Sequence, residues 1–363
     1  MNIVILGLSI TSSWGNGHAT TYRSLVRGLK DRGHRILFLE RDVEWYAGNR
    51  DEPNPPGART VLYQNPGELF REHEAAVVNA DLVIVGSFVP DGIEIGNWVT
   101  SIAKGVTAFY DIDTPVTLDA LQRDTSEYVN RDLVRRYHLY LSFTGGPTLH
   151  KIQSEYRSPM ARPLYCSVDP ARYAPVNSRP ELDLGYLGTY SDDRQPGLDA
   201  LLLEPARRWP QGRFMVAGPM YPDSVKWPSN VKYTIHLSPR EHPAFYGSQR
   251  FTLNITREAM KRAGYSPSVR LFEAAACAVP VISDWWPGLD SIFEVSRQIL
   301  IAEGPEDTLR LLRNVSDRER LSIAHSARDR ILAEHTPAVR SAQLERYVNE
   351  IRATVREHRV VHA

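Results

Sequence analysis

The chain has 363 residues, of which 42% are hydrophobic; at roughly 150 residues per domain, this length favours two domains with separate cores. Lysines and arginines together number 43, as do aspartates and glutamates, so the formal net charge is zero. This balance argues against a protein that binds nucleic acid along its backbone and favours a small-molecule partner.

The cysteine content and the N-terminal residues indicate where in the cell the protein is located. Only Cys166 and Cys277 are present, and their separation fits neither a disulfide framework nor a zinc site. The segment from Met1 to Leu8 reads directly as a strand, without the basic stretch of a signal peptide, and no apolar run approaches about 18 residues. We therefore expect a cytoplasmic protein without a transmembrane segment, and leave peripheral membrane contact open.

Strand and helix patterns alternate through the first half of the chain. Apolar runs predict strands at 3–6, 35–39, 82–85, 105–110 and 138–143, and a helix from Ala19 to Arg32 lies between the first two. Such alternation is typical of a doubly wound parallel sheet, whose ligand-bearing loops follow the carboxyl ends of the strands.

The alternation stops in a proline-rich stretch and then begins again. We interpret 1–165 as a first domain, 166–180 as a linker and 181–336 as a second domain, with strands at 182–188, 214–218, 231–234, 251–254 and 281–283. Residues 337–363 should form a long amphipathic helix, because apolar side chains recur at helical spacing: Leu344, Tyr347, Val348, Ile351 and Val355. The predicted fold class is α/β, with two Rossmann-like domains in tandem.

The segment from Ser266 to Ser283 reads as a capped helix, a tight exit and a buried strand. Ser266 can cap the helix and Pro267 suits its first turn, so free backbone N–H groups would face an anion such as a diphosphate. Two turns further on, Glu273 can accept hydrogen bonds from ribose hydroxyls. The alternative is a surface glutamate paired with Arg270.

Other residues of the second half are candidates for the diphosphate itself. Arg257 and Arg270 can neutralise its charge, or they are solvated side chains on exposed helix faces. Ser266 and Ser268 are either phosphate contacts or ordinary helix caps. Gly188 and Thr189, directly after the first strand of the second series, form either a phosphate-binding loop or a flexible turn.

A glycine-containing loop joins the first strand to the first helix. Gly15 and Gly17 allow a ligand to approach the backbone there, and His18 either acts as a general base on an acceptor hydroxyl or only hydrogen-bonds a sugar or caps the helix. The two glycines and Glu40 superficially imitate a dinucleotide fingerprint. However, the third glycine position holds Thr20, which makes this weak evidence for NAD.

Two carboxylates follow the buried strand at 105–110. Asp111 and Asp113 should stand at the carboxyl edge of the first sheet, where they can bind sugar hydroxyls or take a proton. Alternation in an extended segment puts both on the same side, which suits a catalytic pair and equally suits two solvent-facing residues.

The Glu273 segment closely resembles the C-terminal nucleotide-sugar motif of GT-B glycosyltransferases. Nearly the whole chain resembles the CgeB-like glycosyltransferase family, through the segments 13–22, 38–42, 109–115, 254–257 and 266–283. The resemblance implies two domains facing across a cleft, with the last helix packing back toward the first domain. It also implies a nucleoside diphosphate sugar of the UDP or dTDP type in the second domain, a small-molecule or glycan acceptor at the first, and no metal or other cofactor.

One position departs from the retaining GT-B pattern. That pattern has a second glutamate eight residues before the ribose-type one, and here the position holds Tyr265. The stereochemical outcome therefore stays open. Two alternatives to transfer also stay open: a nucleotide-sugar epimerase or mutase on the same scaffold, and a non-catalytic nucleotide-sugar-binding protein.

Overall fold

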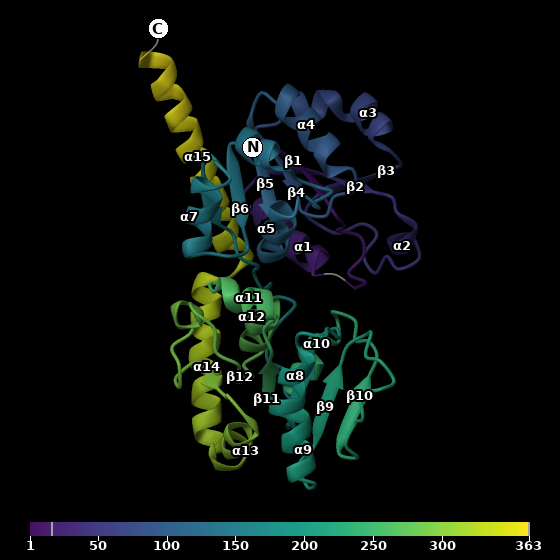
Figure 1. Ribbon diagram of the computed structural model, residues 1–363, viewed down its shortest axis with the longest axis vertical. Coiled ribbons are helices and arrows are strands. Elements are labelled where there is room, and N and C mark those ends of the chain that lie inside the picture. Colours follow the sequence, from purple (N-terminus) through teal and green to yellow (C-terminus); the bar gives the residue numbers. More distant parts are fainter. Residues whose placement is uncertain (16, 362–363) are drawn as a thin grey trace. The chain divides into compact units, whose positions relative to one another are not determined.

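The computed structural model describes residues 1–15 and 17–361 and divides into two compact units (Figure 1). Unit 1 comprises Met1–Ser167 and the C-terminal segment from Pro337, and unit 2 comprises Val168–Thr336. The stretch interpreted as a linker therefore divides after Ser167. Within the described residues, no helix combines the length and apolar character needed to cross a membrane.

Unit 1 is built on a parallel sheet in the strand order β3-β2-β1-β4-β5-β6-β7. Its strands are β1 Asn2–Gly7, β2 Arg35–Arg41, β3 Arg59–Tyr63, β4 Leu82–Gly86, β5 Val106–Asp111, β6 Leu139–Ser142 and β7 Ala161–Pro163. Its helices are α1 His18–Asp31, α2 Glu44–Ala47, α3 Pro66–Val78, α4 Gly92–Ile102, α5 Thr114–Gln122, α6 Arg131–Arg136, α7 Pro147–Ser154 and α15 Pro337–Val361.

Helices cover both faces of this sheet, so its central strands are apolar on both sides. Successive residues of β1 alternate between two cores: Val4 and Leu6 pack with α3, α4 and α6, whereas Ile3 and Ile5 pack with α1 and α15. The predicted apolar stripe of the last helix is buried in this second core through Leu344, Tyr347, Val348 and Ile351. The side chain of Val355 lies outside the described residues.

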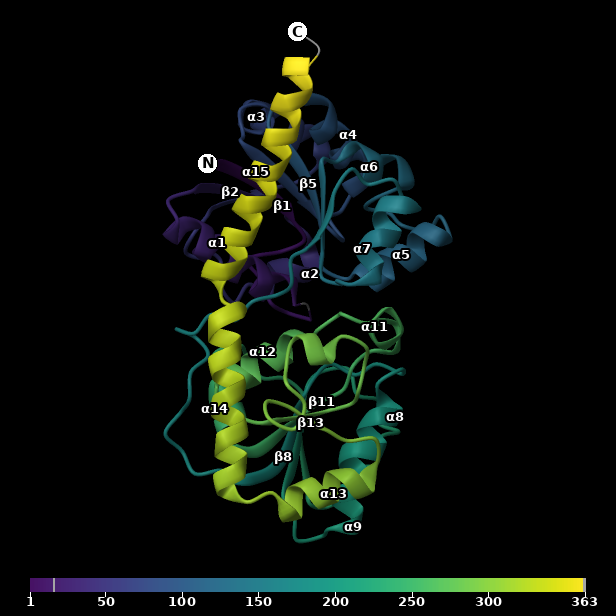
Figure 2. The ribbon, with the colours of Figure 1, turned by 90° about the vertical axis from the view of Figure 1, so that its left-hand side faces the viewer.

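Helix α15 runs along α1 at close range (Figure 2). A glycine makes this approach possible: a Cβ atom on Gly28 of α1 would lie 2.4 Å from the Pro337 carbonyl oxygen and 2.5 Å from the Ser341 hydroxyl. The contact joins the end of the chain to the N-terminal sheet, as part of unit 1.

Unit 2 repeats the plan with the strand order β10-β9-β8-β11-β12-β13, again parallel. Its strands are β8 Leu182–Leu187, β9 Phe214–Ala217, β10 Val231–Thr234, β11 Gln249–Asn254, β12 Val281–Ser283 and β13 Leu300–Ile301. Its helices are α8 Gln195–Leu198, the π-helical turn η1 Asp199–Leu203, α9 Glu204–Arg208, α10 His242–Gly247, α11 Glu258–Ala263, α12 Val269–Ala276, the 3₁₀ turn η2 Leu289–Ser291, α13 Pro305–Asn314 and α14 Asp317–Glu334.

The α/β fold class with two doubly wound sheets is confirmed, as is a long C-terminal helix. In each sheet the strand order has one switch point, where successive strands begin to be added on the other side of the first strand. It lies between β1 and β4 in unit 1 and between β8 and β11 in unit 2. Ligands of doubly wound sheets bind beyond the carboxyl ends of the strands at such points. The loops that follow these four strands are therefore where the candidate residues have to be sought.

Candidate active site

In unit 2, the loop after β8 meets the side chain of Arg270 from α12. The Arg270 guanidinium donates to the Leu187 carbonyl through Nε and to Asn254 Oδ1 through Nη1, at 2.9 Å for the second bond, and lies 4.8 Å above the Tyr186 ring. A Cβ atom on Gly188 would come within 2.7 Å of Arg270 Nη2. The loop after β8 therefore places its backbone directly against a buried cation.

A second arginine, Arg194, converges on the same loop from its far end. Its Nη2 donates to the Thr189 carbonyl, while its Nε is buried without a hydrogen-bond partner among the described residues. Burial is the main cause that lowers the pKa of Arg194, and the nearby cations Arg270 and Arg257 lower it further. A buried donor beside other cations is the environment that an anion would satisfy.

Arg257 and the acidic residues near it complete this region. Arg257 stands at the N-cap of α11, with its side chain 44% exposed and its Nε 3.8 Å from Asp193 Oδ2. The same Asp193 oxygen accepts a hydrogen bond from the Glu258 backbone N–H at 3.0 Å. Lys261 pairs with the buried Asp284 at 3.4 Å, so part of the local positive charge is already balanced.

The cap of the nucleotide-motif helix differs from the prediction. Helix α12 begins at Val269, and Ser268 is its N-cap, accepting from the Arg270 backbone N–H at 3.3 Å. Ser266 is buried two residues earlier, so its assignment as the cap was wrong. Tyr265, at the place of the missing glutamate, has a positive φ of 47° and packs against Gly288.

Glu273 lies on the buried face of α12, and the alternative of a surface glutamate paired with Arg270 does not hold. Its residue is 4% exposed, and its Oε2 accepts a hydrogen bond from the Tyr246 hydroxyl at 3.1 Å. His242 Nδ1 lies 3.6 Å from the same oxygen. The carboxylate is thus held by side chains of α10, which the sequence pattern did not indicate.

In unit 1, the loop after β1 is organised by the buried carboxylate of Glu40. Oε2 accepts from the backbone N–H groups of Ile10 and Thr11 at 2.6 and 3.0 Å, and Oε1 accepts from the hydroxyls of Ser9 and Thr11 at 3.0 and 2.6 Å. Glu40 therefore binds the protein's own loop, and its acceptors are not available to a dinucleotide ribose.

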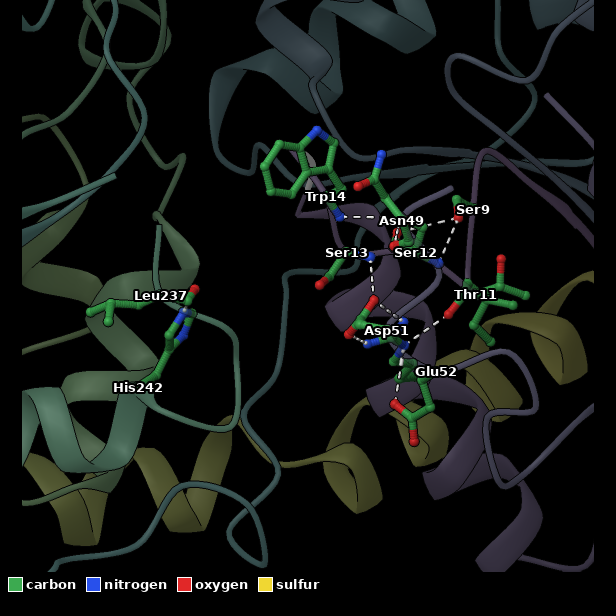
Figure 3. A network of polar contacts seen from close by, with 12 residues as sticks. Ser9, Thr11, Ser12, Ser13, Trp14, Asn49, Asp51, Glu52, Leu237 and His242 are labelled. Carbon is green, nitrogen blue, oxygen red and sulfur yellow. Dashed lines mark hydrogen bonds and ion pairs between the residues drawn. The ribbon is translucent and has the colours of Figure 1, made fainter. Parts of the chain in front are cut away.

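A second carboxylate fixes the next part of this loop (Figure 3). Asp51 accepts from the Ser13 backbone N–H at 2.7 Å and from both terminal nitrogens of Arg23 at 2.8 and 3.0 Å. Partial burial alone would raise the pKa of Asp51. The hydrogen bonds and charge of Arg23 and the hydrogen bond from the Ser13 N–H outweigh it and lower this pKa to about 2. Asp51 is therefore ionised at neutral pH and holds the entry to the glycine segment.

The glycine segment itself is exposed. Gly15 adopts a positive φ of 67°, and Gly17 is the N-cap of α1, without a side chain to bond the helix N–H groups. Asn16 between them lies outside the described residues.

His18 opens α1 and pairs with Asp113 at 3.4 Å, through Nε2 and Oδ2. The imidazole is buried against the edge of Phe88, which follows β4, at a ring separation of 5.7 Å. Its Nδ1 is buried without a hydrogen-bond partner among the described residues, whereas the Asp113 side chain is 28% exposed. Asp113 is therefore the member of the pair that solvent or a substrate can reach.

Asp111 does not share that position, contrary to the expectation of a carboxylate pair on one side. It is the last residue of β5 and is fully buried, with Thr117 donating to Oδ1 at 2.6 Å and Tyr140 donating to Oδ2. Burial raises the pKa of Asp111 to about 6, against the lowering effect of these hydroxyls. The side chain belongs to the interior of unit 1.

The structure thus gathers the predicted residues in two groups. Unit 2 brings Gly188, Thr189, Arg270 and Arg257 together, with Ser266, Ser268 and Glu273 on or before α12. Unit 1 brings His18 and Asp113 together beside the Gly15 and Gly17 loop. Within the described part of the chain, no three histidine, cysteine, aspartate or glutamate side chains gather as metal ligands.

Comparison with known proteins points to one class. Residues 194–346 match a family model described as glycosyl transferase-like. None of the curated protein sequences searched matches the chain. Three similar solved structures are a sucrose-phosphate synthase, the protein Alr3699/HepE bound to UDP-glucose, and an alpha-glucosyltransferase bound to UDP-glucose and DNA with an abasic site.

These structures share the fold at low sequence identity. The synthase, from Thermosynechococcus elongatus, is 13% identical over 98% of this chain and 100% of its own, with a TM-score of 0.67. The Anabaena protein is 13% identical over 96% and 100%, with a TM-score of 0.69, and the alpha-glucosyltransferase is 12% identical over 96% and 99%, with a TM-score of 0.71. Residues 194–346 therefore form a glycosyl transferase-like domain, and the two doubly wound sheets give the chain the GT-B type of fold that these structures share.

Proposed function

We propose that the protein transfers a sugar from a nucleoside diphosphate sugar of the uridine or thymidine type to a hydroxyl group of a small-molecule or glycan acceptor. The observation that carries the donor assignment is the convergence of Arg194 and Arg270 on the loop Gly188–Thr189, with the buried Nε of Arg194 lacking a hydrogen-bond partner among the described residues. The presence of UDP or UDP-glucose in structures of the same fold supports a uridine nucleotide.

In this proposal unit 2 binds the donor. Glu273 accepts hydrogen bonds from the ribose hydroxyls, and the Gly188–Thr189 backbone, Ser266 and Ser268 surround the diphosphate. Arg194, Arg257 and Arg270 supply positive charge. Their guanidinium groups stabilise the negative charge that grows on the diphosphate as it leaves, which is the role a divalent ion plays in other transferases.

The acceptor side of the proposal lies in unit 1. The acceptor oxygen forms a bond to the anomeric carbon, the bond from that carbon to the diphosphate oxygen breaks with its electron pair on the diphosphate, and the acceptor proton passes to Asp113. His18 lies against Asp113 and orients it. Asp111 has no part in this step because it is fully buried. We also propose that the protein is a CgeB-like enzyme and that it is located in the cytoplasm.

The test of the donor site is calorimetric binding of UDP, dTDP and inorganic pyrophosphate to wild type and Arg194→Met. A lost charge-assisted hydrogen bond is worth about 1.5–3 kcal/mol, so we expect affinity to fall by roughly 10- to 100-fold. The matched control is Arg207→Met, because the Arg207 side chain is 46% exposed on α9 and forms an ion pair with Glu204. Equal affinity of the Arg194 variant and wild type would contradict the assignment.

A further inference from the structure

Side chains from two other segments of unit 2 surround the carboxylate of Glu273. The hydroxyl of Tyr246 donates to Oε2 at 3.1 Å, and His242 Nδ1 stands 3.6 Å from that oxygen. Tyr173, which precedes β8, places its hydroxyl 3.3 Å from His242 Nδ1 and faces Glu273, whose charge contributes, after burial, to raising the pKa of Tyr173. Tyr173 and Tyr246 are fully buried, and the His242 side chain is 16% exposed.

The surroundings of His242 fix one of its nitrogens and leave the other able to titrate. Nε2 lies 3.3 Å from the Leu237 carbonyl oxygen, which only accepts, so Nε2 carries a proton. When Nδ1 is unprotonated, it accepts from the Tyr173 hydroxyl and draws that hydrogen away from Glu273. When Nδ1 is protonated, it donates, and the Tyr173 hydrogen is released to Glu273.

The charges that face His242 favour its protonated form. Burial, the largest influence, lowers the pKa of His242, but the hydrogen bond and charge of Glu273, the Leu237 carbonyl and the charge of Glu241 together raise it. Glu241 is itself ionised, since hydrogen bonds from Ser238 lower its pKa, and His236 faces it from the preceding loop. Burial keeps the phenols of Tyr173 and Tyr246 neutral by raising their pKa values.

We propose that His242 is a positioning residue for donor binding: its imidazolium, with Tyr173 and Tyr246, holds the Glu273 carboxylate in place and aimed at the ribose. The inference rests on the proposed function, because it concerns the carboxylate assigned there to the ribose. Because Glu273 helps to raise the pKa of His242, the contact between the imidazolium and the carboxylate is fully formed at lower pH and is lost as pH rises through that pKa. Donor affinity therefore falls from weakly acidic to weakly alkaline solution.

The experiment measures the calorimetric affinity of UDP-glucose and dTDP-glucose for wild type, His242→Gln and Tyr173→Phe from about pH 5.5 to 8.5. A sugar nucleotide is used because its diphosphate diester, unlike free UDP, does not titrate in this range. We expect the wild-type affinity to fall across this range, by a factor of ten for each unit by which the bound donor raises the pKa of His242. His242→Gln should stay near the alkaline wild-type value throughout, and Tyr173→Phe should show a shallower fall.

His325→Gln is the matched control, because His325 is an exposed histidine on α14 of the same unit, and it should keep the wild-type profile. In the ligand-free protein, an NMR titration should show a lower pKa of His242 in Glu273→Gln than in wild type, a result that needs no nucleotide and no folded His242 variant. Tight binding with an unchanged pH profile in His242→Gln would overturn the inference and leave the proposed function standing. No binding of either sugar nucleotide at any pH would overturn both.

Discussion

The buried carboxyl group of Asp111 offers the sharpest test of how unit 1 is built. Replacing it by asparagine, as Asp111→Asn, keeps the shape and removes the ability to ionise. In the structure the group is fully buried at the end of β5, with hydroxyl donors from Thr117 and Tyr140. If Asp111 were a solvent-facing catalytic acid, the substitution would act on turnover alone. Because it is interior, we expect the substitution to act on stability, in a pH-dependent way.

The size of the effect follows from the pKa of Asp111, which burial raises from 3.8 to about 6. An acid whose pKa is higher in the folded state binds more protons there, so folding loses stability as pH rises from about 4 to about 6. At about 1.4 kcal/mol per pKa unit, the full cost above pH 6 is ~3 kcal/mol. Asparagine carries no such cost. The variant should therefore gain about 3 kcal/mol relative to wild type between pH 4 and pH 7.

Hydrogen exchange followed by mass spectrometry is the suitable assay, because peptides from β5 and β6 report the opening of unit 1 separately from unit 2. The control is Asp119→Asn, which removes a carboxylate that is 56% exposed on α5 and should change little with pH. A stability difference between wild type and Asp111→Asn that is constant over this pH range would refute the burial argument.

Two further substitutions test the loops of unit 1. Glu40→Ala leaves the backbone N–H groups of Ile10 and Thr11 without their acceptor. At about 1–3 kcal/mol for each unsatisfied group, the substitution should destabilise unit 1 by about 2–6 kcal/mol in the same exchange assay. Unchanged protection of β1 would show that Glu40 does not organise the loop. Asp113→Asn should slow sugar transfer by roughly 10²- to 10⁴-fold while donor affinity stays within about twofold of wild type. Loss of donor binding, with the catalytic rate preserved, would remove Asp113 from the proton-transfer role.

Much of the fold could be predicted because buried parallel strands are continuous apolar runs, as in β1, β4 and β8. The strands that the sequence did not reveal lie toward the edges of the sheets, where burial is weaker. β3 is mostly half-buried, β7 contains Pro163, and β13 has only two residues. Each lacks the long apolar run from which the central strands could be predicted.

The candidate site was predictable where a residue's role depends on its neighbours in sequence. The loop after β8 and the buried Glu273 helix are of this kind. The helix cap was placed wrongly because Ser266 and Ser268 flank Pro267 and both fit the cap pattern. Asp111 was misjudged because alternation separates a solvent face from a core face only when the sheet has a solvent face, and this sheet is covered on both sides.

The remaining site residues depend on contacts between distant parts of the chain. Arg194 meets Arg270 across 76 positions of sequence, and His242 meets Glu273 across 31, as the residue numbers show. No local spacing encodes such a meeting, because it arises from the order of strands in the sheet. Glu40 illustrates the same point, since its four hydrogen bonds go to a loop about 30 residues earlier.

The measurement that tests the central claim most directly is a thermal-shift and calorimetric screen of UDP, dTDP, GDP and ADP against wild type and Glu273→Gln, with the exposed Glu294→Gln as control. A ligand at about 100 times its dissociation constant stabilises a protein by ~2.7 kcal/mol. The account predicts that UDP or dTDP stabilises wild type and the control, and that Glu273→Gln loses most of this stabilisation. Stabilisation by none of the four nucleotides, or equal stabilisation of Glu273→Gln, would contradict it.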